Sequence, residues 1–266
     1  MDHFLAIANQ LSSVSLSEGL IIIVVFSLAV AVLQLTLRAI IGKSTIIKCH
    51  EVGGHIFAAV GTLYAVVLGL YVLDAQSLYE KRLEGIVSES TALMALYENA
   101  HAMPKEGAER LETSLKNYVG RVVNFEWNSL ANAARDEGAR QELLNASRII
   151  RELNPTTNKQ LVLYDKMNDQ IYDAWKERSQ RIYQSEASKP RLEWGVLMIG
   201  ACITLALGVF FRMDSLALQA TVDILLAVIV SINLFLVAQF RNPYAGEINL
   251  TKEPFVRVLK IMNQTP

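Results

Sequence analysis

The chain has 266 residues, of which 52% are hydrophobic and only 19% are charged, and its mean hydropathy is +0.28. This composition is too apolar for an ordinary soluble protein of this length and favours a membrane protein. The formal net charge of −1 leaves no excess of cations to bind a nucleic-acid backbone. The two cysteines, Cys49 and Cys202, are far apart in the sequence, which excludes a disulfide framework and a zinc ribbon.

Four apolar runs are long enough to cross a membrane as helices. The first contains no charge over 19 residues, and no Lys or Arg precedes it, so we expect it to be retained rather than cleaved as a signal peptide. Only four residues separate the last two runs, which predicts a tight antiparallel hairpin. The runs are Gly19–Leu37, Val52–Leu73, Trp194–Phe211 and Leu216–Phe240.

Four spans place both termini and the segment Ala75–Arg191 on the same side of the membrane. Within roughly 20 residues of the spans, that side carries eleven Lys and Arg residues, against four on the other side. The excess predicts that this side is cytoplasmic, in a multi-pass protein of the cell (inner) membrane. The predicted parts are residues 1–74 with the first two spans, the cytosolic segment 75–191, residues 192–240 with the last two spans, and the tail 241–266.

The cytosolic segment has the pattern of a helical bundle, because apolar residues recur at spacings of three and four between proline and glycine breaks. No strand-like alternation of useful length occurs, so the predicted fold class is all-α, with this bundle inserted between the second and third spans. The expected helices are a continuation of the second span to about Met103, a helix carrying Leu111 to Trp127, Gln141–Leu153, Asn158–Ser185 and a short amphipathic piece over Phe255–Met262.

The sequence HEVGGH, residues His50–His55, resembles the zinc-peptidase signature H-E-x-x-H, but its second histidine comes one residue too late. Five helical steps of ~100° place the two rings roughly 140° apart instead of on one face. A looser metal site from Cys49, His50 and a neighbouring subunit is an alternative to a plain polar boundary of the membrane. No nucleotide-binding or hydrolase signature is present, so we predict no enzyme, no cofactor and no metal.

The second span carries two distinct stripes. Residues with minimal side chains recur at spacings of four, three, four and four and draw one narrow face, which allows close helix packing in lipid. A nearby apolar stripe at i, i+4 and i+8 would narrow a water-filled axis in a ring of subunits and gate it by dewetting. The small face consists of Gly54, Ala58, Gly61, Ala65 and Gly69, and the candidate pore-lining residues are Thr62, Val66 and Leu70.

The fourth span contains polar residues at membrane depth, namely Asp223, Ser231, Asn233 and Gln239. An ionisable residue there is costly, so it indicates either a pathway or a charged partner. Asp223 is only seven residues past Leu216, near the membrane surface. Pairing with Arg212 is therefore an equally good explanation for it.

Several segments together resemble the bestrophin-like domain family of unknown function. They are the second span with its continuation to Pro104, the sequence EWNSL at Glu126–Leu130, the closing hairpin and the tail NPYAGEI to Phe255. The match covers roughly Glu51 to Phe255. Members of that family are considered relatives of the bestrophins, which are ring-forming anion channels with four membrane helices per subunit and cytosolic termini.

The resemblance implies a pentamer whose pore is lined by the second span, with its neck at Thr62, Val66 and Leu70. Thr62 and Leu70 depart from the bulky or aromatic residues of the bestrophin neck. The acidic run that serves bestrophins as a calcium clasp is also missing, since only Glu247 and Glu253 follow the fourth span. Calcium activation is therefore not predicted.

Two functions fit these observations. The first is an oligomeric, bestrophin-like ion channel that conducts anions, because a bare apolar lining suits weakly hydrated anions. Its expected partners are further copies of the chain, the lipid bilayer and chloride. The second is a non-conducting membrane scaffold or sensor whose cytosolic bundle recruits a protein partner.

Overall fold

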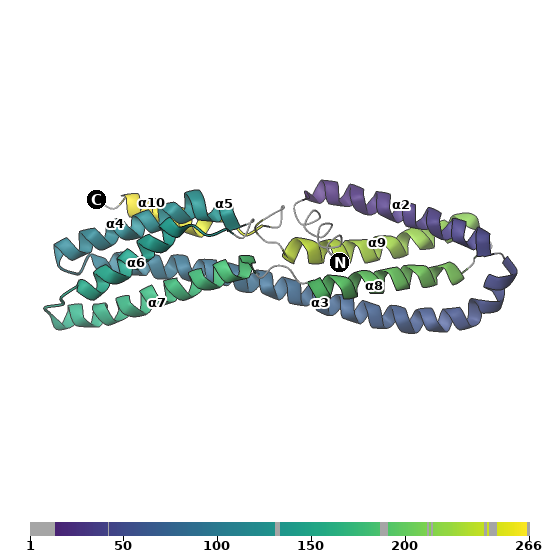
Figure 1. The fold of residues 1–266 in the computed structure, drawn as a ribbon, viewed down its shortest axis with the longest axis horizontal. Coiled ribbons are helices and arrows are strands. Elements are labelled where there is room, and N and C mark those ends of the chain that lie inside the picture. Colours follow the sequence, from purple (N-terminus) through teal and green to yellow (C-terminus); the bar gives the residue numbers. More distant parts are fainter. Residues whose placement is uncertain are drawn as a thin grey trace. The chain divides into compact units, whose positions relative to one another are not determined.

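The computed structural model describes residues 14–41, 43–130, 134–186, 191–211, 213, 215–241, 244 and 249–264. Every regular element within these residues is helical, so the all-α prediction is confirmed for them. In chain order they are α2 (Leu16–Ile41), α3 (Lys43–Ala100), α4 (Lys105–Arg121), a π-helical turn (Val122–Glu126), α5 (Trp127–Leu130), α6 (Glu137–Glu152), α7 (Asn158–Glu186), α8 (Arg191–Leu207), a 3-10 turn (Gly208–Phe210), α9 (Leu216–Arg241) and α10 (Glu253–Gln264) (Figure 1).

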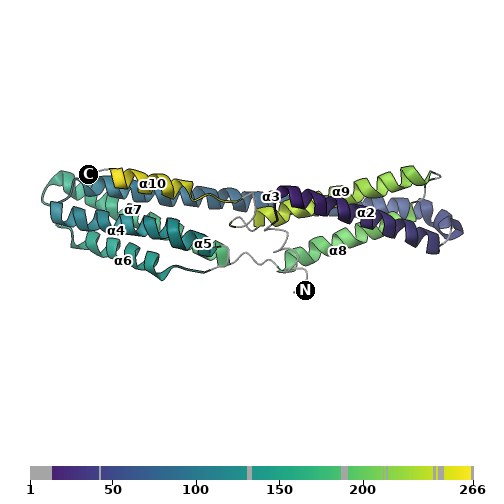
Figure 2. The same ribbon diagram turned by 90° about the horizontal axis from the view of Figure 1, so that it is seen from above.

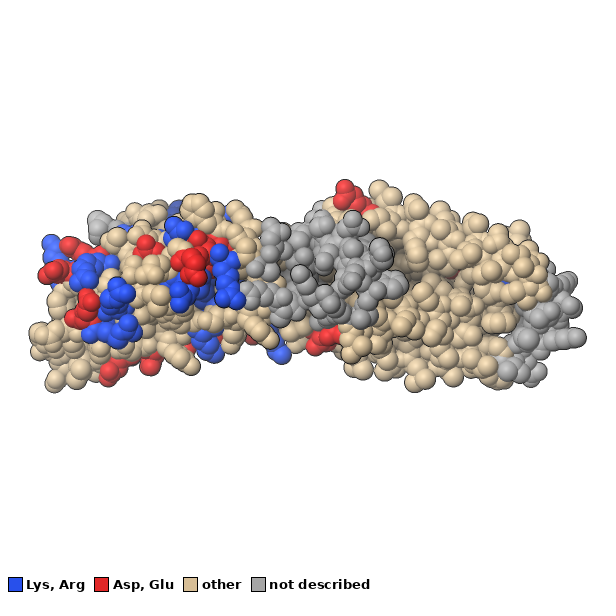
Figure 3. Space-filling model, in the orientation of Figure 1, with Lys and Arg blue, Asp and Glu red and all other residues tan. Residues whose placement is uncertain are grey.

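The chain divides into two compact units, which are described separately. The membrane unit consists of residues 1–79 and 189–248, and the bundle unit of residues 80–188 and 249–266. Among the described residues, four helices are long and apolar enough to cross a membrane, and they match the four predicted runs except for the end residues Val52 and Phe211. On the face seen in Figure 3, the Lys, Arg, Asp and Glu side chains gather on the bundle unit and are nearly absent from the membrane unit.

Within the membrane unit, α2 lies along α9 (Figures 1 and 2). One face of α3 packs on α8 and α9 through Tyr64 and Leu68, which are buried with Leu197. Gly200 allows this packing, because a Cβ atom at that position would lie 2.4 Å from the Tyr64 ring. The Tyr64 hydroxyl donates to the carbonyl oxygen of Leu197 at 3.1 Å, which satisfies its polar end.

Within the bundle unit, α4 packs against α6 and α10, and α6 packs against α7. Many of the apolar stripe positions predicted for the bundle are buried, but Val87, Leu161 and Tyr183 are exposed. Its largest fully buried side chains are Ile86, Leu93, Leu96, Tyr97, Leu111, Leu115, Tyr118, Leu130, Leu143, Ile150 and Phe255.

Two local features of the bundle differ from the sequence prediction. The α6 helix begins at Glu137, four residues before the expected Gln141. The carboxylate of Asp136 caps it, accepting hydrogen bonds from the backbone amides of Gly138 and Ala139 at 3.2 and 3.1 Å. The helix expected through Trp127 is interrupted by the π-helical turn, which buries Val122, Val123 and Glu126.

Replacing Asp136 with alanine is expected to lower the free energy of unfolding by about 1–2 kcal/mol, because the α6 cap is lost. Hydrogen bonding from Arg121 holds the pKa of Asp136 below its usual value, despite partial burial. The stabilisation is therefore present above the unfolded-state pKa and is lost as the pH falls through the folded-state pKa. Denaturant unfolding at neutral and acidic pH would measure this loss.

Asp136→Asn is the matched control, since asparagine also caps helices but carries no charge. At neutral pH, Asp136→Asn should lower the free energy of unfolding less than Asp136→Ala does. The role assigned to the carboxylate would be contradicted if the difference in free energy of unfolding between wild type and Asp136→Ala stayed constant down to strongly acidic pH.

Candidate functional site

The candidate pore residues all lie on the uncovered side of α3. Thr62 is exposed, and the exposed fractions of Val66 and Leu70 are 57% and 63% in the single chain. The Thr62 hydroxyl donates to the carbonyl oxygen of Ala58 at 2.7 Å, so its polar group is satisfied within its own helix. The stripe therefore presents mainly methyl groups.

This stripe lies opposite the face that α3 buries inside the subunit. Val66 is two residues from both Tyr64 and Leu68, and two helical steps rotate a side chain by roughly 200°. Because Tyr64 and Leu68 pack on α8 and α9, Val66 points away from the other helices of the membrane unit. The exposed stripe requires an environment outside the subunit, either lipid, another subunit or a water-filled axis.

The small face is only partly covered by the same chain. A Cβ atom built on Gly61 or Gly69 would meet no atom of the described chain within 4 Å, whereas one on Gly54 would lie 3.7 Å from the Phe211 ring. Ala58 and Ala65 are exposed. Among the described residues, the glycines of this face thus approach other atoms of the same chain only at Gly54.

A groove runs along the small face between α3 and α9. Its volume is about 430 Å³, and Thr204 on α8 also lines it. From α3 it is lined by Phe57, Ala58, Gly61, Thr62, Tyr64, Ala65, Leu68 and Gly69, and from α9 by Leu226, Ile229, Val230 and Asn233. The groove is largely apolar, and the small residues on its α3 side would allow a neighbouring helix to approach closely.

The histidine motif does not form a site within the described side chains. His55 is exposed in the first part of α3. For residues 43–52 the structure describes the helix but not the side chains, Cys49 and His50 included, so the looser metal site stays untested. Where side chains are described, no group of three His, Cys, Asp or Glu residues could hold a metal ion.

Asp223 pairs with a residue that the sequence analysis did not consider. Its carboxylate accepts hydrogen bonds from both terminal nitrogens of Arg38, and the bond from Nη2 is 2.9 Å long. Both side chains are at least 95% buried. The two oxygens of Asp223 are bound by Arg38 and, at 3.2 Å, by the Gln219 amide, so Arg38 accounts for the buried charge, and the alternative pairing with Arg212 stays untested. Arg212 itself lies outside the described residues.

Arg38 also holds the end of the third membrane helix. It donates to the carbonyl oxygens of Gly208 and Val209 at 2.6 and 3.1 Å, in the 3-10 turn that follows α8. Helix ends leave carbonyl groups without partners, and in lipid these groups must be satisfied by protein. One guanidinium thus joins α2, the end of α8 and α9.

Two of the other polar residues of the fourth span bond to backbone, whereas the buried hydroxyl of Ser231 has no hydrogen-bond partner among the described residues. The Asn233 amide donates to the carbonyl oxygen of Ile229 at 2.9 Å, and the Gln239 amide donates to that of Val14 at 3.1 Å. These bonds satisfy polar groups inside the unit, so they give no reason to place a pathway along α9.

The family comparison agrees with this architecture. A family model described as the bestrophin-like domain matches residues 24–255 of the chain. The chain belongs to the bestrophin-like domain family. Together with the four apolar helices, this membership identifies a membrane protein.

Solved structures share the bestrophin-like fold at low sequence identity. A bacterial bestrophin homologue from Klebsiella pneumoniae is 14% identical, with a TM-score of 0.69 over 91% of this chain and 99% of that chain. A mutant of that homologue is 16% identical with a TM-score of 0.65, again over 91% and 99% of the two chains. A mutant described only as a membrane protein is 15% identical, with a TM-score of 0.68 over the same shares. No curated protein sequence matches the chain.

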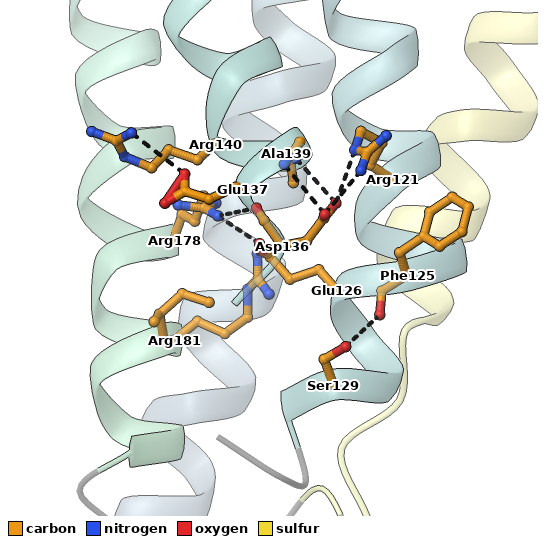
Figure 4. A network of polar contacts seen from close by, with 12 residues as sticks. Arg121, Phe125, Glu126, Ser129, Asp136, Glu137, Ala139, Arg140, Arg178 and Arg181 are labelled. Atoms are coloured by element: carbon orange, nitrogen blue, oxygen red, sulfur yellow. Dashed lines mark hydrogen bonds and ion pairs between the residues drawn. The ribbon is translucent and has the colours of Figure 1, made fainter. Parts of the chain in front are cut away.

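The bundle unit of this bestrophin-like chain contains a buried cluster of charges. Arg181 donates to both oxygens of Glu89 at 2.9 and 3.0 Å and to Glu126 at 2.9 Å. Arg178 donates to the other oxygen of Glu126 at 2.5 Å, so the two arginines grip one carboxylate (Figure 4). The charge cluster joins α3, the π-helical turn and α7.

Tyr118 on α4 completes the charge cluster by donating its hydroxyl to Glu89. Burial, and then the charge of Glu89, raise the pKa of Tyr118 well above its ordinary value, so it stays a donor. Burial alone would lower the pKa of Arg181, but the charge of Glu89 and its neighbours outweighs burial and raises it. All the charges are therefore matched in the folded state.

Proposed function

We propose that the chain forms an oligomeric, anion-conducting membrane channel whose pore is lined by α3. The observation that carries this proposal is the exposed stripe of Thr62, Val66 and Leu70, which lies opposite the packed face of α3. Membership of the bestrophin-like family supports a membrane channel. The solved homologues supply the fold on which such a channel would be built.

Further copies of the chain are the proposed occupants of the small face. The groove beside Gly61 and Gly69 leaves space for a neighbouring helix, and close backbone approach stabilises helix pairs in lipid. A ring closed through this flank would turn the Val66 stripe toward its axis. We take five subunits from the family resemblance.

The proposed ion preference follows from the lack of fixed charge on the stripe. From Val52 to Leu73 the α3 helix has no charged residue except a histidine that can be neutral, so an axis lined by it offers no fixed charge to a cation. An apolar constriction conducts by admitting ions that lose water readily, and chloride is more weakly hydrated than common metal cations. We therefore propose chloride as the permeant ion.

Val66→Ala and Leu70→Ala are expected to raise the chloride flux of the purified protein in liposomes, because smaller side chains widen an apolar constriction and keep it wet. The measurement compares chloride with potassium flux under both polarities, in a preparation whose oligomeric state has been verified. Altered chloride flux would establish both the conduction and the pore helix.

Two matched controls lie on α2. Val25 and Leu20 are exposed to 60% and 59%, almost the same as Val66 and Leu70, and they lie on a different membrane helix. Val25→Ala and Leu20→Ala should leave the flux unchanged. If the α2 substitutions changed the chloride flux as much as the α3 substitutions, α3 would not line the pore.

The proposed orientation places the chain in the cell (inner) membrane with both termini and residues 75–191 in the cytosol, as the eleven-to-four distribution of cations favours. Labelling of single cysteines from outside intact cells would test it. Cysteines in the bundle unit should stay unlabelled until the membrane is permeabilised.

A non-conducting scaffold or sensor is the second candidate function. It is favoured by exposed aromatic residues on the bundle unit, where Tyr172 and Tyr183 of α7 are 68% and 69% exposed. Such residues are frequent at protein interfaces. A folded, oligomeric protein that carries no ion under either polarity would favour this function over the channel.

A further inference from the structure

A small pocket opens in the bundle unit where the start of α6 meets α7. Its volume is about 220 Å³, below the roughly 300–1,000 Å³ of pockets that hold drug-sized ligands. It therefore fits a small ligand of a few atoms. The pocket, called the arginine pocket below, is lined by Arg135, Asp136, Glu137, Arg140, Trp175, Arg178, Ser179, Ile182 and Tyr183.

Arginines outnumber acids in the lining, and one acid is already engaged. The two carboxylate oxygens of Asp136 accept hydrogen bonds from Arg121, which lies outside the lining, each at 2.9 Å. Glu137 is exposed and forms an ion pair with Arg140 at 3.4 Å. The dipole of the sixteen-residue helix α6 adds to the positive potential at its first turn. The electrostatics of the pocket thus favour an anion.

Arg178 gives independent evidence for a missing partner. It is 5% exposed, yet its Nε atom has no hydrogen-bond partner among the described residues. Both of its hydrogen bonds come from Nη2, to Glu126 at 2.5 Å and to the Asp136 carbonyl oxygen at 3.3 Å. Figure 4 shows Arg178 reaching from α7 to the start of α6, beside Glu137 and Arg140. A buried guanidinium nitrogen that lacks a partner is expected to recruit an oxygen acceptor.

We propose that the arginine pocket binds a small oxyanion, a phosphate or a carboxylate, through Arg178 and Arg140. The planar guanidinium of an arginine matches the paired oxygens of either group. Arg140 lies on the exposed side, where an entering anion would displace its weak contact with Glu137. All the lining residues belong to the bundle unit, so this site is separate from the α3 stripe.

The test titrates the full-length protein in detergent with inorganic phosphate and, separately, with malonate, at ionic strength held constant with sodium chloride. Trp175 lines the pocket, so its fluorescence reports occupancy. A saturable change is expected for at least one of the two anions, and which one responds identifies the source as phosphate or carboxylate. Arg140→Gln should raise the half-saturating concentration about tenfold or more, because one charge-assisted hydrogen bond is lost.

Arg257→Gln is the matched control, because Arg257 forms a similar exposed pair with Glu253 at 3.2 Å but lies on α10. It should leave the titration unchanged. Ser179→Leu fills the pocket without changing any charge and should abolish the response, which keeps the test valid if Arg140→Gln folds poorly.

The absence of saturation with both anions in the folded wild type would overturn the proposal. So would saturation that neither Arg140→Gln nor Ser179→Leu alters, because the anion would then bind elsewhere. The assay measures binding without ion flux, so its result is independent of whether the chain conducts.

Discussion

Arg181→Met should lower the free energy of unfolding of the bundle unit by about 3–5 kcal/mol. Arg181 is the centre of the charge cluster, and its side chain is 3% exposed while those of Glu89 and Glu126 are fully buried. Without it, Glu89 keeps only the Tyr118 hydroxyl and becomes a buried charge without a cation. Urea unfolding in detergent, followed through Trp127 and Trp175 in a Trp194→Phe background, would measure the loss.

Arg110→Met is the control for this prediction. Arg110 pairs with Glu152 between α4 and α6 at 3.0 Å, close to the distances at Arg181, but both side chains are about half exposed. Exposed pairs contribute about 0–1 kcal/mol. Equal losses in the two variants would show that water screens the charge cluster and that burial does not govern its contribution.

Arg38→Met should destabilise the membrane unit by a similar amount, about 3–5 kcal/mol, because it leaves Asp223 charged and buried. The substitution also removes the donor that serves the Gly208 and Val209 carbonyls. The Gln219 amide remains beside Asp223 but brings no positive charge. The expected result is a lower apparent melting temperature and a reduced yield of monodisperse protein in detergent.

The double variant Arg38→Met with Asp223→Leu separates the charge from the packing. Apolar residues in place of a buried ion pair are often tolerated, so the double variant should recover much of the loss seen in each single variant. Recovery should stay incomplete, since the two carbonyl groups of the 3-10 turn remain without a donor. If the stability loss of the double variant equalled the sum of the losses of the two single variants, Arg38 and Asp223 would not be directly paired.

The membrane helices were predictable because lipid imposes a long apolar run on each of them. The bundle helices were predictable from their buried stripes, such as Leu111 and Leu115. The partner of Asp223 was missed because Arg38 follows the apolar run and was counted as a loop residue. A signal was present, since Ser27, Gln34 and Arg38 recur on one buried stripe of an otherwise apolar helix.

The charge cluster could not be read from the sequence. Glu89 and Arg181 are 92 positions apart, and at either position a charged residue in a helix is normally solvated. Only the packing of α3, α4 and α7 shows that they are buried together. The π-helical turn was equally hidden, because its residues are compatible with an ordinary helix. The predicted pore stripe, in contrast, was visible because its evidence is local periodicity.

The π-helical turn makes one part of the bundle sensitive to length. It spans the five residues Val122–Glu126, is followed directly by Trp127 and places Glu126 between Arg178 and Arg181. Each residue added or removed there rotates the following helix by ~100°. Substitutions that keep the size of Val122 or Val123 should be accepted during evolution, whereas a single insertion or deletion would turn Glu126 away from its cations. Relatives of this chain should accordingly vary in length in the connection around Pro155, between α6 and α7, and keep the residue count between α4 and Glu126 constant.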